Sequence, residues 1–400
     1  MTIIAEKPVA GGSCLARVDG KAVFVPFVLP GEAAEIEIVE NRKDWAKARL
    51  IRVLEKSPRR VEPACPLFGS CGGCSLQMAD SAYQGEMRAA VAADSLRRAG
   101  SAWDGAIPVK AGEPYGYRCR AQFHRDESGK PGFSASRSSD IVPVTDCPIL
   151  VPELRQALAD GTIAREMGRF FSNRGLRSSS GTGRGQNRRR GERTAAAPGR
   201  FQVFADGGRL YHEGGTTTAS VALSGKKLTF DVRGFFQSNL ALLETLLRDV
   251  TGDLKGPGTL LDFYAGVGTF SAFAGSTLGR AVLVEHNAAA LDFARINVGL
   301  AGPSLALCPV SDEQWPEHPD SRRNFDVAII DPPRQGLARK TLDWFASSAI
   351  PEIRYVSCDP VTFARDSALL ERAGYRLERV TLYDFYPQTQ HAEVYGRFTR

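Results

Sequence analysis

The 400-residue sequence lacks any apolar run long enough to cross a membrane. Its first eight residues also lack the basic and then apolar segments of a secretory signal. These absences argue against a membrane-bound or exported protein, so we expect a cytoplasmic one without a membrane partner. The length is sufficient for two or three domains, and we expect a monomer.

The chain also lacks a strong charge of one sign. A net charge of +6 is only weak evidence for a polyanionic partner. The distribution is more informative, because eight arginines and one glutamate fall within residues 173–200. This Arg/Gly/Ser-rich insert has little to bury, so we expect it to be disordered. It either contacts single-stranded RNA or is only a solvated linker.

A disulfide framework is not expected, because the eight cysteines occur in a chain without a secretory signal. Four of them form a pattern, Cys65-x5-Cys71-Gly-Gly-Cys74 with Cys147 far downstream. Four thiolates can hold either a [4Fe–4S] cluster or a structural zinc ion, and the spacing does not distinguish them. Cys119 competes with Cys147 for the fourth position.

The first sixty residues read as short strands. Asp19-Gly20 lies between two apolar stretches and predicts a hairpin turn, while residues 35–40 alternate apolar and charged side chains. This pattern predicts a small OB-like β-barrel, a fold that often binds oligonucleotides. A purely structural β-domain fits the pattern equally well.

From Thr259 onward, apolar strands alternate with helices, which predicts a parallel sheet covered on both faces. Residues 375–383 and 392–398 are joined too closely for a helical crossover, so we expect these last two strands to be antiparallel. The expected strand ends place Asp331, Cys358 and Glu393 at one sheet edge. Parallel sheets bind ligands at that edge.

A glycine-rich turn precedes these residues, and it lacks one glycine of the dinucleotide fingerprint. Gly266 and Gly268 follow a strand and open a helix, but Ser271 occupies the third position, which argues against NAD. Glu285 ends the next strand, where a carboxylate accepts hydrogen bonds from a ribose. Together with a later Asp-Pro-Pro, these features resemble class I S-adenosylmethionine-dependent methyltransferases. Alternatively, the glycines serve only the packing of strand on helix.

A cysteine is unnecessary for methylation of oxygen or nitrogen, but it suits methylation of pyrimidine C5. A thiolate that adds to C6 activates C5 towards the methyl sulfonium, and a base must then remove the C5 proton. We therefore predict Cys358 as the nucleophile and Glu393 as the base. Since a free thiol is mostly protonated near neutrality, the site must lower its pKa or remove its proton on attack.

Several ordered segments resemble the motifs of the RNA 5-methyluridine methyltransferases. They are Phe235-Phe-Gln-Ser-Asn239, Asp262 to Phe270, Asp331-Pro-Pro-Arg-Gln-Gly336, Ser357-Cys-Asp-Pro360 and His391-Ala-Glu393. The resemblance implies a Rossmann-like α/β domain over residues 235–400 with a mostly parallel seven-stranded sheet and an antiparallel last strand. It implies cofactor contacts at Gln237, Tyr264, Gly266, Gly268, Thr269, Glu285, Asp312 and Asp331, and substrate contacts at Phe235, Asp331 and His391.

The same resemblance covers the N-terminal part. It implies a TRAM-like RNA-binding barrel over residues 1–60 and a small α+β iron–sulfur domain over residues 61–234, with Cys65, Cys71, Cys74 and Cys147 holding a [4Fe–4S] cluster. This combination resembles the enzymes that modify 23S rRNA more than those that modify tRNA. Two other functions remain open, namely a non-catalytic RNA-binding or RNA-folding protein and a methyltransferase that acts on nitrogen.

Overall fold

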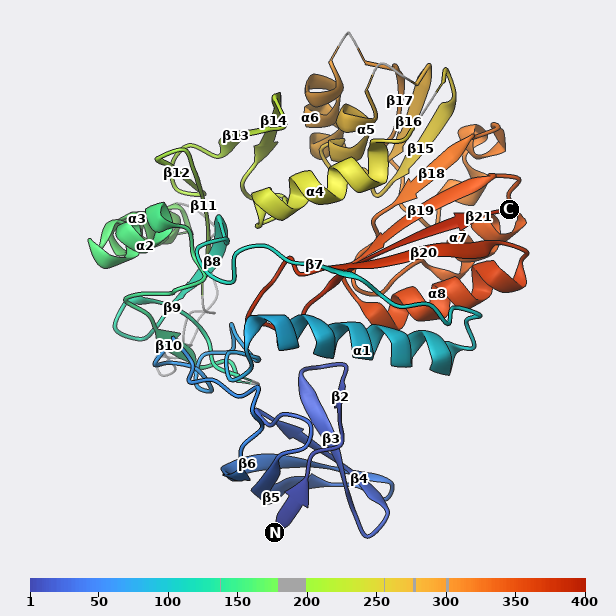
Figure 1. Cartoon of the computed structure of the whole chain (residues 1–400). Helices are drawn as coiled ribbons and strands as arrows, with labels where there is room; N and C mark the ends of the chain where they lie inside the picture. The colour runs from blue at the N-terminus through green and yellow to red at the C-terminus, as the bar shows by residue number, and fades with distance from the viewer. Residues whose placement is uncertain (137, 179–198, 255, 276–277, 300–301) are drawn as a thin grey trace, which may run out of the picture.

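The computed structural model describes residues 1–136, 138–178, 199–254, 256–275, 278–299 and 302–400 (Figure 1). Strands dominate the N-terminal part, which contains β1 (Thr2–Ile4), β2 (Lys7–Val9), β3 (Ser13–Val18), β4 (Lys21–Pro26), β5 (Ala33–Asn41) and β6 (Trp45–Glu55). They form one sheet in the order β1-β5-β6-β4-β3-β2. The predicted hairpin is confirmed, because β3 and β4 pair antiparallel around Asp19 and Gly20, which both have positive φ.

The middle of the chain mixes helices and short strands. It contains α1 (Ser81–Ala99), β7 (Val109–Lys110), β8 (Arg120–Arg125), β9 (Pro131–Ser134), β10 (Ile141–Pro143), α2 (Pro152–Ala159), α3 (Thr162–Ser178), β11 (Arg200–Asp206), β12 (Arg209–His212), β13 (Thr218–Leu223) and β14 (Lys226–Asp231). A five-stranded sheet has the order β10-β9-β8-β11-β12.

Only the ends of the predicted disordered insert lie in the described part of the chain. Residues 173–178 belong to helix α3, and Arg200 begins β11. The expected disorder of the insert stays a prediction. Residues 179–198 lie outside the described residues.

The C-terminal part alternates strands and helices as predicted. It contains α4 (Leu240–Thr251), β15 (Thr259–Phe263), α5 (Thr269–Ala274), β16 (Arg280–Val284), α6 (Ala288–Val298), β17 (Ser304–Cys308), the 3-10 turns η2 (Trp315–Glu317) and η3 (Pro319–Arg322), β18 (Val327–Ile330), α7 (Arg339–Ser347), β19 (Glu352–Ser357), α8 (Pro360–Arg372), β20 (Arg376–Tyr383) and β21 (Glu393–Thr399). The sheet order is β17-β16-β15-β18-β19-β21-β20-β7.

The described sheet therefore has eight strands rather than the predicted seven. The extra strand is β7, two residues from the middle of the chain that pair parallel with β20. The first five strands are parallel, and β21 is antiparallel to both β19 and β20, which confirms the predicted chain reversal. A strand of two residues is too short to show an alternation of apolar and polar side chains in the sequence, and its pairing depends on tertiary contacts.

Successive residues of the sheet strands pack into two different cores. Leu260, Leu283 and Ile329 face α4, α5 and α6 in one cluster, whereas Leu261, Val282 and Ile330 face α7 and α8 in the other. Residues from α1 also join the second cluster, so α1 covers the sheet together with α8 (Figure 1). This alternation explains why the sheet strands are apolar along their whole length.

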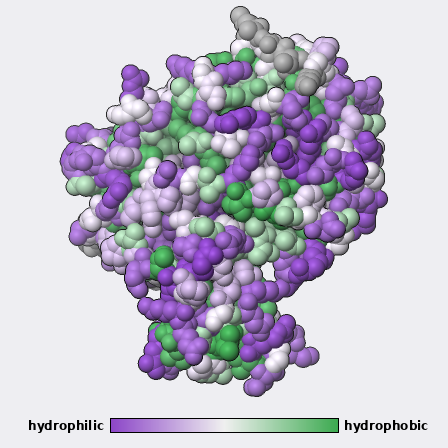
Figure 2. All heavy atoms as spheres, viewed as in Figure 1, coloured by the Kyte–Doolittle hydropathy of each residue, from purple (hydrophilic) through white to green (hydrophobic). Residues whose placement is uncertain are grey.

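The N-terminal strands form a narrower lobe beneath the rest of the molecule (Figures 1 and 2). Helix α1 lies across between the two parts (Figure 1). The core of this lobe includes Val23, Val25 and Ile36, and it continues into Leu76 and Met87 of the middle segment. Among the described helices, none combines the length and apolar character needed to span a membrane.

Candidate active site

Cys358 lies at the carboxyl edge of the sheet, in the turn between β19 and α8. Asp359 caps the helix, because its carboxylate accepts hydrogen bonds from the backbone N–H groups of Val361 and Thr362, both at 2.9 Å. Pro360 occupies the first helical position, where its missing N–H costs nothing. The Cys-Asp-Pro sequence thus fixes the strand-to-helix turn and leaves Cys358 only half-buried.

Glu393 faces the same edge from the antiparallel strand. Ser357 pairs with Val394, so the next positions outward are Cys358 on one strand and Glu393 on the other. Asp331 follows β18, the strand on the other side of β19. The structure therefore brings these three residues together at one edge of the sheet, and Glu393 is only 1% exposed.

Burial and mutual repulsion raise the pKa values of all three side chains. Burial raises the pKa of Glu393 well above its usual range, and the negative charge of Asp331 adds to the effect. Burial and the charge of Asp262 raise the pKa of Asp331 to about 7. Burial and the charges of Glu393 and Asp331 raise the pKa of Cys358 to about 12, so the thiol is not ionised in advance.

A pocket of about 160 Å³ opens in front of Cys358. His391 and Arg334 line it, and their Nε2 and Nη2 atoms lie 3.4 Å apart. Burial and the positive charge of Arg334 lower the pKa of His391 to about 4, so the imidazole is neutral. The opposite wall is the turn between β2 and β3, which places the N-terminal lobe beside the nucleophile.

The glycine-rich turn joins the predicted cofactor residues on the neighbouring strands. Tyr264 has a positive φ of 64° and donates from its hydroxyl to the Asp312 carboxylate at 2.7 Å. The N–H of Gly266 donates to Glu285 at 3.2 Å. Thr269 begins α5 and is half-buried.

Gly268 is required at the start of α5 by its own conformation and by a neighbour. Its φ is 74°, and a Cβ there would lie 2.8 Å from the Cβ of Ala294. Ser271 replaces the third glycine of the dinucleotide fingerprint, and its N–H and hydroxyl both donate to the buried carboxylate of Asp262, at 3.1 and 2.6 Å. Ser271 therefore anchors the turn to β15.

The predicted residues before α4 lie in different environments. Gln237 is 9% exposed, and its side-chain oxygen accepts a hydrogen bond from the Tyr386 hydroxyl at 3.4 Å. Phe235 is 67% exposed and does not line the described pocket in front of Cys358. Phe236 packs in the core, where its ring stacks on Phe230 at 3.9 Å between centroids.

Sequence reasoning assigned no role to Arg334 or Tyr386. The charge of Arg334 opposes the rise in the pKa of Cys358 and Glu393. Its place in the Asp-Pro-Pro-Arg segment, three residues after the carboxylate, could have indicated this. Tyr386 contacts Gln237 only because two distant segments meet, and no sequence pattern signals that contact.

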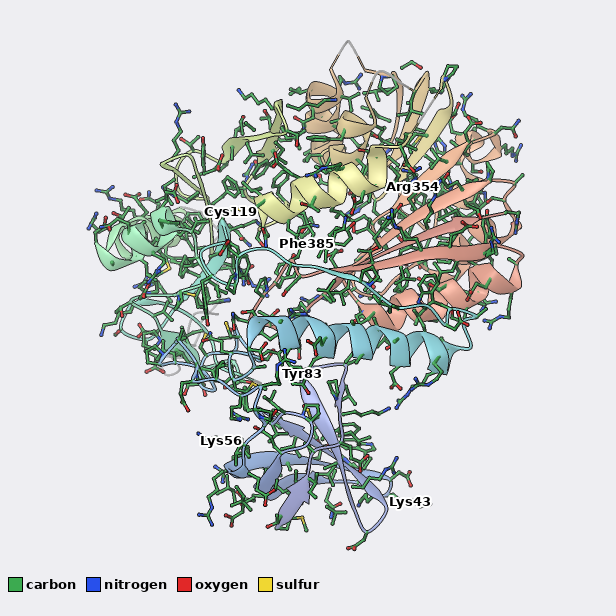
Figure 3. The ribbon with its side chains drawn as sticks, in the orientation of Figure 1. Lys43, Lys56, Tyr83, Cys119, Arg354 and Phe385 are labelled. Atoms are coloured by element: carbon green, nitrogen blue, oxygen red, sulfur yellow. The ribbon has the colours of Figure 1, made fainter. Side chains whose placement is uncertain are left out.

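The four clustered cysteines surround a separate cavity of about 130 Å³, which Cys65, Cys71, Cys74 and Cys147 all line. Burial raises the pKa of Cys74 to about 11 and that of Cys147 to about 12, and neighbouring cysteines contribute to both shifts. Cys119 is not among the lining residues. It is 2% exposed and its thiol donates to the Ser238 carbonyl at 3.2 Å (Figure 3).

Comparison with known proteins identifies two family models along the chain. Residues 207–398 match the tRNA (uracil-5-)-methyltransferase model, and residues 2–51 match the TRAM domain. An uncharacterized RNA methyltransferase of Treponema denticola is 36% identical over 99% of this chain and 98% of its own length. The 23S rRNA (uracil(1939)-C(5))-methyltransferase of Photorhabdus laumondii is 30% identical, with 100% and 96% covered.

A solved structure shares the fold over the full length of both chains. It is the Pyrococcus abyssi tRNA (uracil-54, C5)-methyltransferase in complex with S-adenosyl-L-homocysteine, with a TM-score of 0.68 and 22% identity. The relatives therefore match this chain over nearly its whole length as well as theirs. This chain belongs to the family of S-adenosylmethionine-dependent RNA uracil-C5 methyltransferases.

Proposed function

We propose that this chain methylates C5 of a uridine in RNA through a covalent bond between the Cys358 sulfur and uracil C6. The observation that supports this mechanism most directly is the meeting of Cys358, Asp331 and Glu393 at one sheet edge beside the glycine-rich turn. Methylation of nitrogen would need no thiol at this position.

The first step is attack by Cys358. Because its thiol is protonated at rest, a carboxylate must take the proton as sulfur approaches C6. Asp331 can do so, since its pKa of about 7 leaves much of it ionised at neutral pH. As the S–C6 bond forms, the C5–C6 electron pair moves towards O4 and makes C5 nucleophilic.

S-adenosylmethionine supplies an electrophilic methyl group on a positively charged sulfur. After C5 has accepted that methyl group, Glu393 takes the C5 proton, the C5–C6 double bond forms again and the S–C6 bond breaks. The departing thiolate of Cys358 recovers its proton from Asp331. Glu393 can act only when ionised, so its raised pKa makes the rate depend on pH.

The cofactor residues proposed from the sequence fit a nucleoside with a charged amino-acid tail. The carboxylates of Glu285 and Asp312 accept hydrogen bonds, and the space beside the Gly266 backbone is open, with no atom of the described residues within 4 Å of the place of a Cβ. Gly268 belongs to the same proposed set and begins α5. The proposed set also includes Gln237, Tyr264, Thr269 and Asp331. Phe235, Asp331 and His391 are the proposed contacts of the target nucleotide, with the exposed Phe235 ring available for stacking on a base.

We also propose that Cys65, Cys71, Cys74 and Cys147 hold a [4Fe–4S] cluster. A tetrahedral zinc site with Zn–S bonds of about 2.3 Å would place the sulfurs about 3.8 Å apart. Among the described residues, Cys308, His318 and Asp320 are potential metal ligands whose ligand atoms lie within 4.8 Å of one another. No three of the four clustered cysteines bring their sulfurs that close together. The four cysteines thus line a cavity with their sulfurs further apart than a single zinc ion would hold them, which favours a larger inorganic group.

The proposed substrate is 23S rRNA rather than tRNA. This preference follows the relative from Photorhabdus laumondii, which covers this chain completely and carries that activity in its name. The same proposal includes an OB-like barrel, the division at residues 60 and 235, a monomeric state and a cytoplasmic location.

The nucleophile can be tested by labelled methyl transfer to unmodified 23S rRNA and to unmodified tRNA. Cys358→Ala should abolish transfer and the covalent adduct with 5-fluorouridine RNA. The matched control is Cys308→Ala, because Cys308 likewise lies at the carboxyl end of a parallel strand, although it is more deeply buried than Cys358. Transfer by Cys358→Ala would favour methylation of nitrogen, and no transfer by the parent protein to any RNA would favour a non-catalytic RNA-binding protein.

A further inference from the structure

The loop between β20 and β21, residues 384–392, connects two strands of the catalytic sheet and leads directly into Glu393. Most of it is buried, including Asp384, Gln388 and Thr389. It also carries His391, which lines the pocket at Cys358. The conformation of this 384–392 loop therefore decides where the proposed base Glu393 and the proposed substrate contact His391 lie.

The 384–392 loop is held in a conformation that its sequence does not favour. Gln388 has a φ of 71°, a left-handed value that costs a non-glycine residue about 1–2 kcal/mol. It is also only 1% exposed. A buried residue in such a conformation persists only where its surroundings impose it.

The surroundings make five hydrogen bonds to Gln388, and each of its four hydrogen-bonding groups takes part. Its carbonyl accepts from the backbone N–H groups of Ser75 and Leu76, at 2.9 and 3.0 Å. Its N–H donates to the Gln84 side-chain oxygen at 2.8 Å, and its own side-chain oxygen accepts from the Gln84 amide at 3.0 Å. The side-chain amide nitrogen of Gln388 donates to the Pro114 carbonyl at 3.4 Å.

Two more residues from the same part of the chain hold the flanks of the 384–392 loop. Arg88, one helical turn after Gln84 on α1, donates to the Thr389 carbonyl at 2.6 Å and forms an ion pair with Asp384. The Tyr117 hydroxyl donates to the Pro387 carbonyl at 2.9 Å. Figure 3 shows Phe385 of this loop in the space between α1 and α4.

We infer that Gln84 is a positioning residue for the proposed base Glu393, acting through Gln388, and that the Cys74–Leu76 segment acts on the same point. The inference depends on the proposed function, because it assigns the loop a catalytic purpose. It also gives the cysteine-rich segment a mechanical link to the active site, since Ser75 and Leu76 directly follow Cys74.

Gln84→Ala should test this link, because it leaves the buried N–H of Gln388 without its acceptor. We expect kcat to fall by about 10–100-fold with an unchanged KM for S-adenosylmethionine, since the base rather than the cofactor is displaced. The protein–RNA adduct should accumulate, because removal of the C5 proton becomes slow. Hydrogen exchange in peptides covering residues 384–392 should become faster.

Two further variants separate positioning from general destabilisation. Gln388→Gly accepts the positive φ and keeps all three backbone hydrogen bonds of this position, so it should retain more activity than Gln84→Ala. Gln156→Ala, an exposed glutamine on helix α2, is the matched control and should change nothing. Normal kcat, adduct level and loop exchange in Gln84→Ala would overturn the inference. If the parent protein transfers no methyl group, the exchange measurement still tests the link independently.

Discussion

Cys358 is surrounded by carboxylates, and their charges determine when its thiol can react. A helix N-terminus follows it, which by itself favours a thiolate. Burial and two acidic neighbours outweigh that effect and raise its pKa to about 12. Of the two possibilities left by the sequence, the carboxylates around Cys358 therefore favour removal of the proton during attack over a thiol that is ionised in advance.

At this scale, Glu393→Gln should trap the covalent intermediate. The amide is similar in size to the carboxyl group, but it cannot take the C5 proton, so the S–C6 bond cannot break. A stable protein–RNA band should appear in denaturing gels with labelled RNA, while turnover stops. Glu378→Gln on β20 is the control, because this glutamate lies at the surface. Rapid turnover by Glu393→Gln would mean that another group is the base.

The pH dependence should reveal the coupling between Glu393 and Asp331. A carboxyl group with a raised pKa is protonated below that pKa and can accept a proton only above it, so kcat/KM should increase with pH. Asp331→Asn removes a charge that raises the pKa of Glu393. The pH at which its residual activity rises should therefore be lower than in the parent protein. Asp343→Asn, an exposed aspartate on α7, should leave the profile unchanged, and a shift to higher pH in Asp331→Asn would contradict the coupling.

At the scale of secondary-structure elements, short polar segments fix where the strands and helices of the site begin and end. Asn239 caps α4 by accepting from the Leu242 N–H at 3.2 Å, and Asp359 caps α8 in the same way. The turn from β15 into α5 depends instead on two glycines with positive φ. These local signals are short, so they could be recognised in the sequence.

The two glycines of this turn should differ in their tolerance of alanine. The Cβ added by Gly266→Ala would have no atom of the described part of the chain within 4 Å. This substitution should therefore lower the free energy of unfolding only through the positive φ, by about 1–2 kcal/mol. Gly268→Ala also collides with Ala294, so it should lower the free energy of unfolding by roughly 1–3 kcal/mol more. Denaturant titration followed by tryptophan fluorescence would measure both. Equal losses would mean that α6 can move away from α5.

At the scale of the whole molecule, the segment between the N-terminal lobe and the catalytic sheet is a structural part of both. α1 packs on α8, and β7 extends the catalytic sheet. The core of the N-terminal lobe continues into Met87 of α1. The cysteine cavity lies in this same connecting segment, so a change there should affect more than one lobe.

The proposed cluster gives a prediction at this scale. Protein purified without oxygen should contain iron and sulfide, and Cys147→Ala should lose both, because this cysteine closes the cavity from a distant loop. Cys119→Ala should retain the iron, since that thiol is buried against Ser238 instead. Zinc without iron in the parent protein would exclude a [4Fe–4S] cluster.

The sequence by itself determined which groups follow one another along the chain at the proposed active edge of the sheet: a glycine-rich turn, a carboxylate, a cysteine and a final glutamate. Strand period and turn residues are local properties, so the hairpin at Asp19 and the antiparallel last strand could both be predicted. Only the tertiary structure decided the eighth strand, the raised pKa values and the contacts of Gln84 with Gln388. Those features arise between residues up to 304 positions apart, where burial and charge depend on packing that no local pattern records.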